Sequence, residues 1–379
     1  MKLLVIPNGF EANYVLGFLR GIVAQGVRPL VVSYDEIAAQ LGELGIEHCN
    51  LHECQDPHRS IARKIGQLVA YYFDLVALVW RQRGQPFHYI GIFRNKKILM
   101  EGVLLASLFR ILASRYYYTV HNVLPHHEEN SRLFRFIYRW VYRIPHRLVV
   151  HTPGAAEQLQ REFGIPADKI VTISIGLNEE VPRATVSTAA ARQQLSLDTD
   201  AFWFLFFGKT EPYKGLDLLL EAWRQTGSKR VRLAVVGPCP DPAYRKQISS
   251  LIDRLPEPES VTWREGFVAN EELGLWLKAV DAGVLPYRNI YQSGVVFLYL
   301  QHGLPILASE VGNLDQYVGD KEGRLLPVGD QAAWSTEMSN WAQGNLTFDR
   351  EQIRQSARTY SWEKVCIPLI KDYEGLPSC

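Results

Sequence analysis

The stretch LFFGKTEPYKGLD, residues 205–217, decides the fold of this chain. Its apolar beginning predicts a buried strand, which ends on Gly208 and Lys209, and after a short loop Lys214 and Gly215 open an apolar helix. In open α/β sheets, ligands bind outside the carboxyl ends of the strands, and the N–H groups at a helix N-terminus favour phosphate. The stretch therefore predicts a phosphate site, with a solvated loop carrying two surface lysines as the alternative.

Length indicates the number of domains, and the distribution of charge indicates the kind of partner. A chain of 379 residues is too long for one ordinary core, so we expect two domains. The net charge is only +1, but residues 57–147 contain fifteen Lys and Arg against four Asp and Glu. Nine of the ten histidines also lie before residue 152. This asymmetry favours an anionic partner for the first half.

Cysteine usage and the first residues indicate the compartment. The five cysteines show no metal-ligand spacing, which suits a reducing cytoplasm: Cys49, Cys54, Cys239, Cys366 and Cys379. The beginning, MKLLVIPNGF, predicts a first strand rather than a signal peptide. No run of about eighteen apolar residues predicts a membrane span. We therefore expect a cytoplasmic protein.

Strand and helix patterns alternate along the chain, which predicts parallel βαβ units and an α/β doubly wound fold. In the first half we expect strands at residues 2–6, 29–33, 116–120, 147–151 and 170–175, and helices at 13–24, 37–44, 61–84, 102–113, 132–147 and 155–163. In the second half we expect strands at residues 202–207, 231–236, 261–265, 282–286, 305–308 and 323–326. Residues 178–200 are polar and predict a linker between the domains.

Three helices of the first half, at residues 61–84, 102–113 and 132–147, combine apolar and basic residues. In the third helix, Arg132, Arg135, Arg139 and Arg143 recur every three or four residues beside an apolar face. Each helix alone suits a core element with a solvated basic face. Together they predict a surface that rests on anionic lipid headgroups. Nucleic acid is the rival polyanion, but no nucleic-acid motif accompanies the charge.

Further candidate ligand residues follow the predicted strands. In the second half these candidates are Gly237, Phe267, Val268 and Arg288, and a helix start carries Gln292, Ser293, Gly294 and Val295. A serine at a helix start caps N–H groups, and glycine lets a ligand approach the backbone. In the first half, predicted strands end at His121, Asn122 and His151; further candidates are Asn8, Gly9, Asn13 and Glu128.

Several motifs in order resemble the GT-B fold glycosyltransferases of family 4, also called group 1. They are YTVHNVLPHHEEN, RLVVHTPGAAEQL, FGKTEPYKGLDLLLEAW, VDAGVLPYRNIYQSGVVFLYLQHGLPILASEVGNLDQYV and YSWEKVCIPLIKDYE. The resemblance implies two Rossmann-like domains that face each other across a cleft. Residues 1–180 would bind the acceptor, residues 181–360 the nucleotide sugar, and residues 361–379 would form a helix that crosses back to the first domain.

The resemblance also implies roles for single residues. Lys209 occupies the place of the usual arginine, Lys214 matches the usual lysine, and the pair would hold the donor diphosphate. The loop with Phe267 and Val268 would pack on the base, and His121 would face the sugar. One departure is clear: the two glutamates that the family places eight residues apart correspond to Ile290 and Leu298. The usual glutamate contact with the donor therefore cannot be carried over.

The resulting expectation is a transferase that moves a sugar from a nucleotide-diphosphate sugar to a lipid-linked or polysaccharide acceptor. It would serve synthesis of exopolysaccharide, O-antigen or glycolipid at the inner face of the cytoplasmic membrane. The family implies retention of configuration, and the two lysines would replace a metal. An inverting reaction would need a general base, for which His121, Glu128 and Glu11 are candidates. A non-catalytic GT-B binding subunit and a nucleotide-sugar epimerase are the alternatives.

Overall fold

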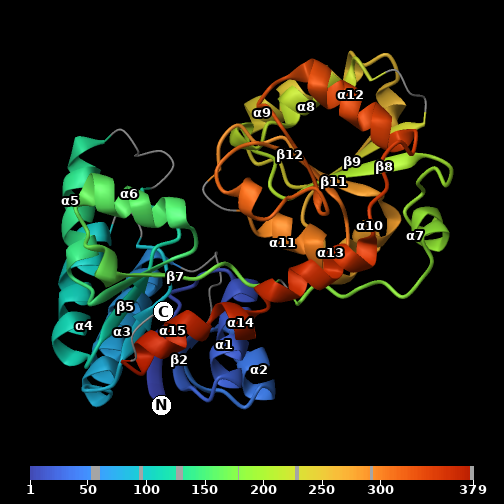
Figure 1. Ribbon diagram of the computed structural model, residues 1–379. Helices are drawn as coiled ribbons and strands as arrows, with labels where there is room; N and C mark the ends of the chain where they lie inside the picture. The colour runs from blue at the N-terminus through green and yellow to red at the C-terminus, as the bar shows by residue number, and fades with distance from the viewer. Residues whose placement is uncertain are drawn as a thin grey trace. The chain divides into compact units, whose positions relative to one another are not determined.

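A computed structural model describes residues 1–52, 60–93, 97–124, 131–177, 179–226, 230–290 and 293–375. The chain forms two compact units (Figure 1). The first comprises Met1–Gly176 together with Tyr360–Cys379, and the second comprises Leu177–Thr359. The chain thus leaves the first unit once, builds the second, and returns.

The first unit is built on a parallel sheet of seven strands in the order β3-β2-β1-β4-β5-β6-β7. The strands are β1 (Lys2–Ile6), β2 (Arg28–Tyr34), β3 (Glu47–His52), β4 (Phe87–Tyr89), β5 (Tyr116–Thr119), β6 (Arg147–Val150) and β7 (Ile170–Thr172). Every pairing is parallel. All seven strands therefore end at the same edge of the sheet.

Helices cover both faces of this sheet. One core contains side chains of α3 (Ile61–Arg81), the π-helical η2 (Leu99–Leu105), α4 (Ala106–Leu112), α5 (Arg132–Arg143) and α6 (Pro153–Phe163). The core on the other face contains α1 (Ala12–Ala24), α2 (Asp35–Glu43), α14 (Trp362–Val365) and α15 (Ile367–Tyr373). Strands buried on both faces explain the continuous apolar runs in the sequence.

The second unit contains a parallel sheet of six strands in the order β10-β9-β8-β11-β12-β13. The strands are β8 (Phe202–Phe207), β9 (Val231–Gly237), β10 (Val261–Glu265), β11 (Ala282–Leu285), β12 (Ile306–Ser309) and β13 (Gly323–Leu326). Its helices are α7 (Thr188–Gln194), α8 (Leu216–Trp223), α9 (Pro242–Asp253), α10 (Asn270–Ala279), α11 (Gly294–Gln301), α12 (Gln331–Ala342) and α13 (Arg350–Ala357). The strand order reverses direction between β8 and β11, which is the position where such sheets bind ligands.

The α/β fold class is confirmed, with differences in single elements. Strands β3 and β4 were not predicted, because β3 is polar and β4 is only three residues long. The third basic helix ends at Arg143 rather than at residue 147, and the second begins as a π-helix at Leu99. The predicted linker contains helix α7.

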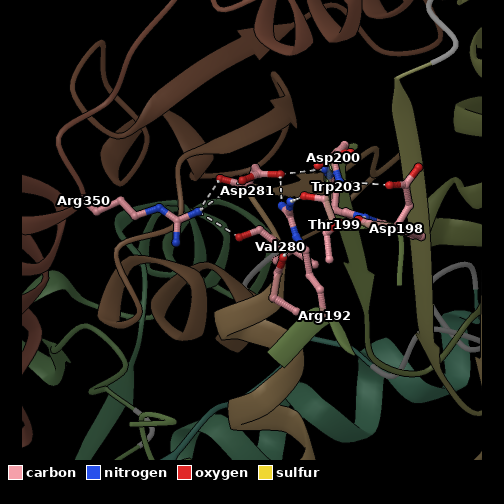
Figure 2. A network of polar contacts seen from close by, with 9 residues as sticks. Arg192, Asp198, Thr199, Asp200, Trp203, Val280, Asp281 and Arg350 are labelled. Carbon is pink, nitrogen blue, oxygen red and sulfur yellow. Dashed lines mark hydrogen bonds and ion pairs between the residues drawn. The ribbon is translucent and has the colours of Figure 1, made fainter. Parts of the chain in front are cut away.

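Helix α7 belongs to the second unit because its buried Arg192 is bound there (Figure 2). Arg192 Nε donates to the carbonyl of Ala279 at 2.8 Å, and its NH2 lies 2.6 Å from a carboxylate oxygen of Asp281. The same carboxylate accepts a hydrogen bond from the backbone N–H of Trp203, in β8. A polar sequence therefore forms a buried structural network rather than a free connection.

The C-terminal helices pack on the first unit through Trp362. A Cβ atom on Gly17 of α1 or on Gly176 would lie 2.1 Å and 2.2 Å from the indole ring, so only glycine fits there. Further along, the buried Asp372 accepts hydrogen bonds from the Tyr117 hydroxyl at 2.6 Å and from Arg147 Nε at 2.9 Å. Residues 362–373 are thus part of the core of the first unit.

Candidate functional site

The carboxyl ends of β8 and β9 meet through two glycines. Gly208 has φ +102° and Gly237 has φ +136°, both in the region that favours glycine. A Cβ atom on Gly237 would lie 2.3 Å from the carbonyl oxygen of Gly208. The third strand in this row, β10, also ends on a glycine of positive φ, Gly266. At these three positions, the carboxyl ends of β8, β9 and β10 therefore present backbone atoms without side chains, which we call the glycine floor.

The two lysines of the opening stretch have different environments. Lys214 is buried, and its ammonium nitrogen lies beside Gly208, 2.9 Å from where a Cβ atom on that glycine would be. Lys209 is exposed and forms an ion pair with Glu211. The structure thus places Lys214 at the strand end, as the phosphate hypothesis requires, and Lys209 on the surface of the same loop.

The loop after β8 is held against the loop after β11. Gly215 has φ +69° and begins α8, and a Cβ atom there would lie 1.9 Å from the carbonyl oxygen of Pro286. Arg288 was expected to bind the donor, but its guanidinium forms a bidentate ion pair with Asp217, with NH1 at 2.7 Å and NH2 at 2.5 Å. Arg288 therefore positions the two loops.

The electrostatics of this pair follow from its contacts. Burial raises the pKa of Asp217, but hydrogen bonds from Arg288 and Tyr244 outweigh burial and hold that pKa below its usual value. The Arg288 pKa is raised by its bond to Asp217. Asp217 and Tyr244 were not singled out from the sequence. An acidic residue in the first turn of the helix after Lys214-Gly215 was the available signal.

The start of α11 lies close to the same strand end. Val295 Cγ2 would be 3.9 Å from a Cβ atom on Gly208. Ser293 precedes the helix, but its hydroxyl makes no side-chain cap and instead lies 3.2 Å from the Tyr287 hydroxyl. Around Gly294 a Cβ atom would meet nothing within 4 Å. The first N–H groups of α11 are therefore not used by the Ser293 side chain.

The remaining donor-side candidates lie at the end of β10. Phe267 is 84% exposed, whereas Val268 is buried. An exposed aromatic ring after a glycine offers a flat face on which a base can stack. The position that the usual glutamate would occupy, Leu298, is buried in the core of the second unit.

In the first unit, His121 follows β5 and packs among aromatic rings. Its ring stacks on Phe10 with centroids 3.8 Å apart, and Tyr14 and His151 lie within 5.5 Å. Its Nε2 donates a hydrogen bond to the carbonyl of Ile90 at 2.6 Å. Burial, and then His151, hold its pKa well below the usual value. His121 is therefore a neutral imidazole whose Nδ1 is the hydrogen-bond acceptor.

The acceptor-side candidates divide into two groups. Asn8 and Gly9 form a turn of positive φ after β1, and the Asn8 amide donates to the Tyr89 hydroxyl at 2.6 Å and accepts from Tyr71 at 3.2 Å. Its side chain therefore builds the turn. Asn13 and Asn122 are partly exposed, as a ligand contact requires, and Glu11 is exposed before α1. Glu128 and Gln292 lie outside the described residues.

A large apolar face is exposed on the first unit. Most of the exposed large apolar side chains in the described part of the chain lie on α3, η2, α4 and α5: Ile65, Leu68, Val69, Phe73, Val76, Trp80, Leu99, Met100, Leu104, Ile111, Leu133, Phe136 and Trp140. We call these residues the exposed apolar face. Within the described residues, no helix is both long and apolar enough to cross a bilayer.

The expected arginine stripe is only partly available. Arg132, Arg139 and Arg143 are exposed beside the apolar side chains of α5. Arg135 forms an ion pair with Glu162 at 2.6 Å, so its charge is compensated within the first unit. Among the residues that the structure describes, no group of His, Cys, Asp and Glu has a metal-binding arrangement.

Two family models match the chain. Residues 11–176 match the family described as "Glycosyl transferase 4-like domain", and residues 201–343 match "Glycosyl transferases group 1". The two matches follow the two units of the structure and together cover most of the chain.

Curated relatives of the chain are named as glycosyltransferases. The chain is 30% identical over 239 residues to a D-inositol 3-phosphate glycosyltransferase of Saccharomonospora viridis, covering 60% of this chain and 55% of the relative. It is 31% identical over 213 residues to the protein of that name from Streptomyces scabiei, covering 53% and 47%. The chain thus spans about half the length of the curated relatives it matches.

Solved structures share the fold over the whole chain. HepE of Anabaena in complex with UDP has a TM-score of 0.76 at 16% identity and covers 99% of this chain and 100% of its own. WaaG, a glycosyltransferase involved in lipopolysaccharide biosynthesis, has a TM-score of 0.67 at 15% identity, with coverage of 99% and 100%. Both similarities place the chain among GT-B folds.

Proposed function

We propose that this chain, which belongs to the group 1 glycosyltransferases with a family 4-like first domain, moves a sugar from a nucleotide-diphosphate sugar to an acceptor hydroxyl. The observation that carries the proposal is the Lys214 ammonium beside Gly208, at the point where the strand order of the second sheet reverses. A buried cation above a glycine floor suits a diphosphate. The exposed Phe267 ring suits the base of the same nucleotide.

The proposed chemistry is stabilisation of the departing diphosphate. Lys214, Lys209 and the N–H groups at the start of α11 would take up the negative charge that develops as the glycosidic bond breaks, in place of a metal. The leaving phosphate would accept the acceptor proton, with retention of configuration. His121 has a lowered pKa and a lone pair on Nδ1, so it suits accepting a hydrogen bond from a sugar hydroxyl better than serving as a general base.

For the acceptor, we propose a lipid-linked or polysaccharide molecule at the inner face of the cytoplasmic membrane. The exposed apolar face, with Arg132, Arg139 and Arg143 beside it, supports contact with an anionic bilayer. The role would be synthesis of a cell-surface glycan. The names of the curated relatives make a soluble inositol phosphate the second acceptor to test.

The test is substitution of Lys214 by alanine. We expect Lys214→Ala to reduce nucleotide release from UDP- or GDP-sugars by about 10²-fold or more, because one preorganised charge at the leaving group is lost. The matched control is Lys246→Ala, which removes an exposed lysine of α9 in the same unit. Circular dichroism and melting curves would show that both variants are folded.

Near-normal turnover in Lys214→Ala would contradict the proposed site. Screening donors with a lipid extract, with inositol phosphate and without acceptor separates the acceptor classes. The buried Leu298 in place of a glutamate keeps a non-catalytic binding subunit as the second candidate. Saturable nucleotide-sugar binding without turnover on any acceptor would favour that subunit.

A further inference from the structure

A cluster of cations lies at the opposite edge of the first sheet from His121. Because β5, β6 and β7 are parallel neighbours, the residues that begin them share one edge. Arg115 precedes β5, Arg147 begins β6 and Lys169 precedes β7. The last turns of α4 and α5 bring Arg110 and Arg143 to the same place. We call these five residues, with His146, the cationic edge.

The contacts show that these groups are close together. Lys169 Nζ donates to the carbonyl of Arg143 at 2.6 Å, and Arg110 NH1 contacts His146 Nε2. Burial, and then the neighbouring cations Arg110, Arg143 and Arg147, lower the Lys169 pKa to about 8. Burial, and then Arg110, lower the His146 pKa to about 4.

Negative charge within the described residues compensates only one side of the cationic edge. Arg147 Nε binds a carboxylate oxygen of Asp372 at 2.9 Å, and Arg115 NH1 lies 3.7 Å from the other. Among the described residues, no carboxylate lies within ion-pair distance of Arg110, Arg143 or Lys169. Cations at helix C-termini are favoured by the helix dipole, which accounts for Lys169 on the end of α5. It does not account for Arg110 against His146.

The arrangement of His146 requires a further acceptor. The ring Nδ1 of His146 accepts a hydrogen bond from the backbone N–H of Tyr116 at 2.9 Å. The backbone N–H of His146 donates to the Tyr116 carbonyl at 2.8 Å. The ring is therefore fixed, and a neutral imidazole that accepts at Nδ1 carries its proton on Nε2. That proton faces the Arg110 guanidinium, which also only donates. An oxygen anion bound beside this contact would accept hydrogen bonds from both groups.

We propose that the cationic edge binds a phosphate group, held by Arg110, His146 Nε2, Arg143 and Lys169. This site is separate from the proposed donor site and does not depend on transfer activity. Phosphate oxygens match the several N–H donors that converge there. The phosphate can come from a soluble phosphomonoester or from a lipid headgroup, since Ile111 and Trp140 of the exposed apolar face are one residue and three residues from Arg110 and Arg143.

The experiment uses the full chain in a Lys214→Ala background, so that phosphate binding at the donor site does not contribute. Glycerol 3-phosphate is titrated while the Lys169 ammonium is followed by NMR, and vesicles of phosphatidylcholine with or without phosphatidic acid are tested by co-sedimentation. We expect bound phosphate to raise the Lys169 pKa. We expect Arg110→Gln to weaken binding about tenfold or more, and Arg110→Lys to retain part of it. Arg28→Gln, which removes an exposed arginine at the start of β2 in the same unit, is the matched control.

The outcomes separate the sources. Saturable binding of glycerol 3-phosphate that depends on Arg110 supports a soluble ligand. Binding only to phosphatidic acid vesicles, again dependent on Arg110, supports a lipid headgroup. Equal losses in Arg110→Gln and Arg28→Gln would show general charge attraction and overturn the site. Absence of any binding to either probe would also overturn it.

Discussion

Gly215 and Gly294 are two glycines of the proposed donor site with different surroundings. Gly215 has φ +69° and no room for a Cβ atom beside Pro286, whereas Gly294 begins α11 in open space. Gly294 was predicted to be a donor-side residue and Gly215 to begin a helix, but sequence alone cannot distinguish a glycine that the fold requires from one that leaves space for a ligand. The difference comes from the contact between the loops after β8 and β11, which joins residues about seventy positions apart.

At Gly215, substitution by alanine should reduce stability. A positive φ costs a non-glycine residue about 1–2 kcal/mol, and the clash with the Pro286 carbonyl adds to this cost. Melting curves of Gly215→Ala should therefore shift to lower temperature. By contrast, Gly294→Ala should melt like the wild type but bind the nucleotide sugar more weakly, because its methyl group covers N–H groups proposed to contact phosphate. Equal stability of the two variants would contradict this difference.

The site residues that could be predicted are charged residues and glycines that follow a predicted strand or begin a predicted helix. Lys214 and Gly208 lie together as the strand-loop-helix pattern indicates. Arg288 also lies at this strand end, but its partner Asp217 could not be identified because a bidentate ion pair depends on the spacing of two loops. In the same way, the His121 ring is fixed by donating a hydrogen bond to the backbone carbonyl of Ile90, which has no side-chain signature.

At the scale of elements, helix α7 shows how a polar sequence becomes part of a core. The stretch around it lacks an apolar periodicity, so it was interpreted as a linker. Arg192 instead is buried with its guanidinium bound to three separate groups (Figure 2). A single charged residue replaces the apolar pattern on which sequence interpretation depends.

Replacing Arg192 should therefore destabilise the second unit. We expect Arg192→Met to lower the free energy of unfolding by about 3 kcal/mol, since it leaves the Asp281 carboxylate without its closest cation. Arg224→Met, at an exposed arginine after α8, is the control and should change stability little. Urea denaturation of both variants measures the difference. If Arg192→Met lost no more free energy of unfolding than Arg224→Met, the network would be dispensable for stability.

The exposed apolar face is a property of elements rather than of single residues. Helix α3 buries Leu75 and Val79 on one side and exposes Phe73 and Val76 on the other. An apolar pattern predicts that a helix is buried, but it does not identify what buries it. The sequence predicted that α3 belongs to a surface that contacts lipid, but not which of its apolar side chains are buried and which are exposed.

Removing one large side chain from this face should weaken membrane binding. Phe73 is 75% exposed, and burial of such a side chain in lipid contributes about 1.5–3 kcal/mol. Phe73→Ser should thus reduce co-sedimentation with anionic vesicles by about tenfold. Phe267→Ser, at the exposed phenylalanine of the second unit, should leave vesicle binding unchanged and weaken nucleotide binding. Unchanged vesicle binding in Phe73→Ser would refute the membrane proposal.

At the scale of the whole molecule, the first unit contains buried histidines that make its folded state less stable in acid. Burial lowers the pKa of His88 to about 3 and that of His151 to about 4. Both pKa values are below the value of about 6.5 expected in the unfolded chain. Protons therefore bind the unfolded chain first, so the stability present above pH 6.5 is lost as the pH falls toward 4.

This linkage predicts a measurable acid transition. Between pH 7 and pH 5, each histidine should reduce the free energy of unfolding by roughly 2 kcal/mol. Melting temperatures measured over this range should fall, and part of the fall should disappear in a variant with His88→Asn and His151→Asn, if that variant folds; His121 and His146, whose pKa values are also lowered, account for the rest. The single variants serve as a second measurement. A melting temperature independent of pH between 7 and 5 would contradict the buried neutral state.

The return of Trp362 to its glycine-lined slot has a consequence for the order of synthesis. Gly17 and Gly176 are made before the second unit, but the indole that fills the space between them is made after it. The inserted second unit can close its own core before that moment, whereas the first unit cannot. During translation, the first unit is therefore completed after the second, although most of its residues are made before it.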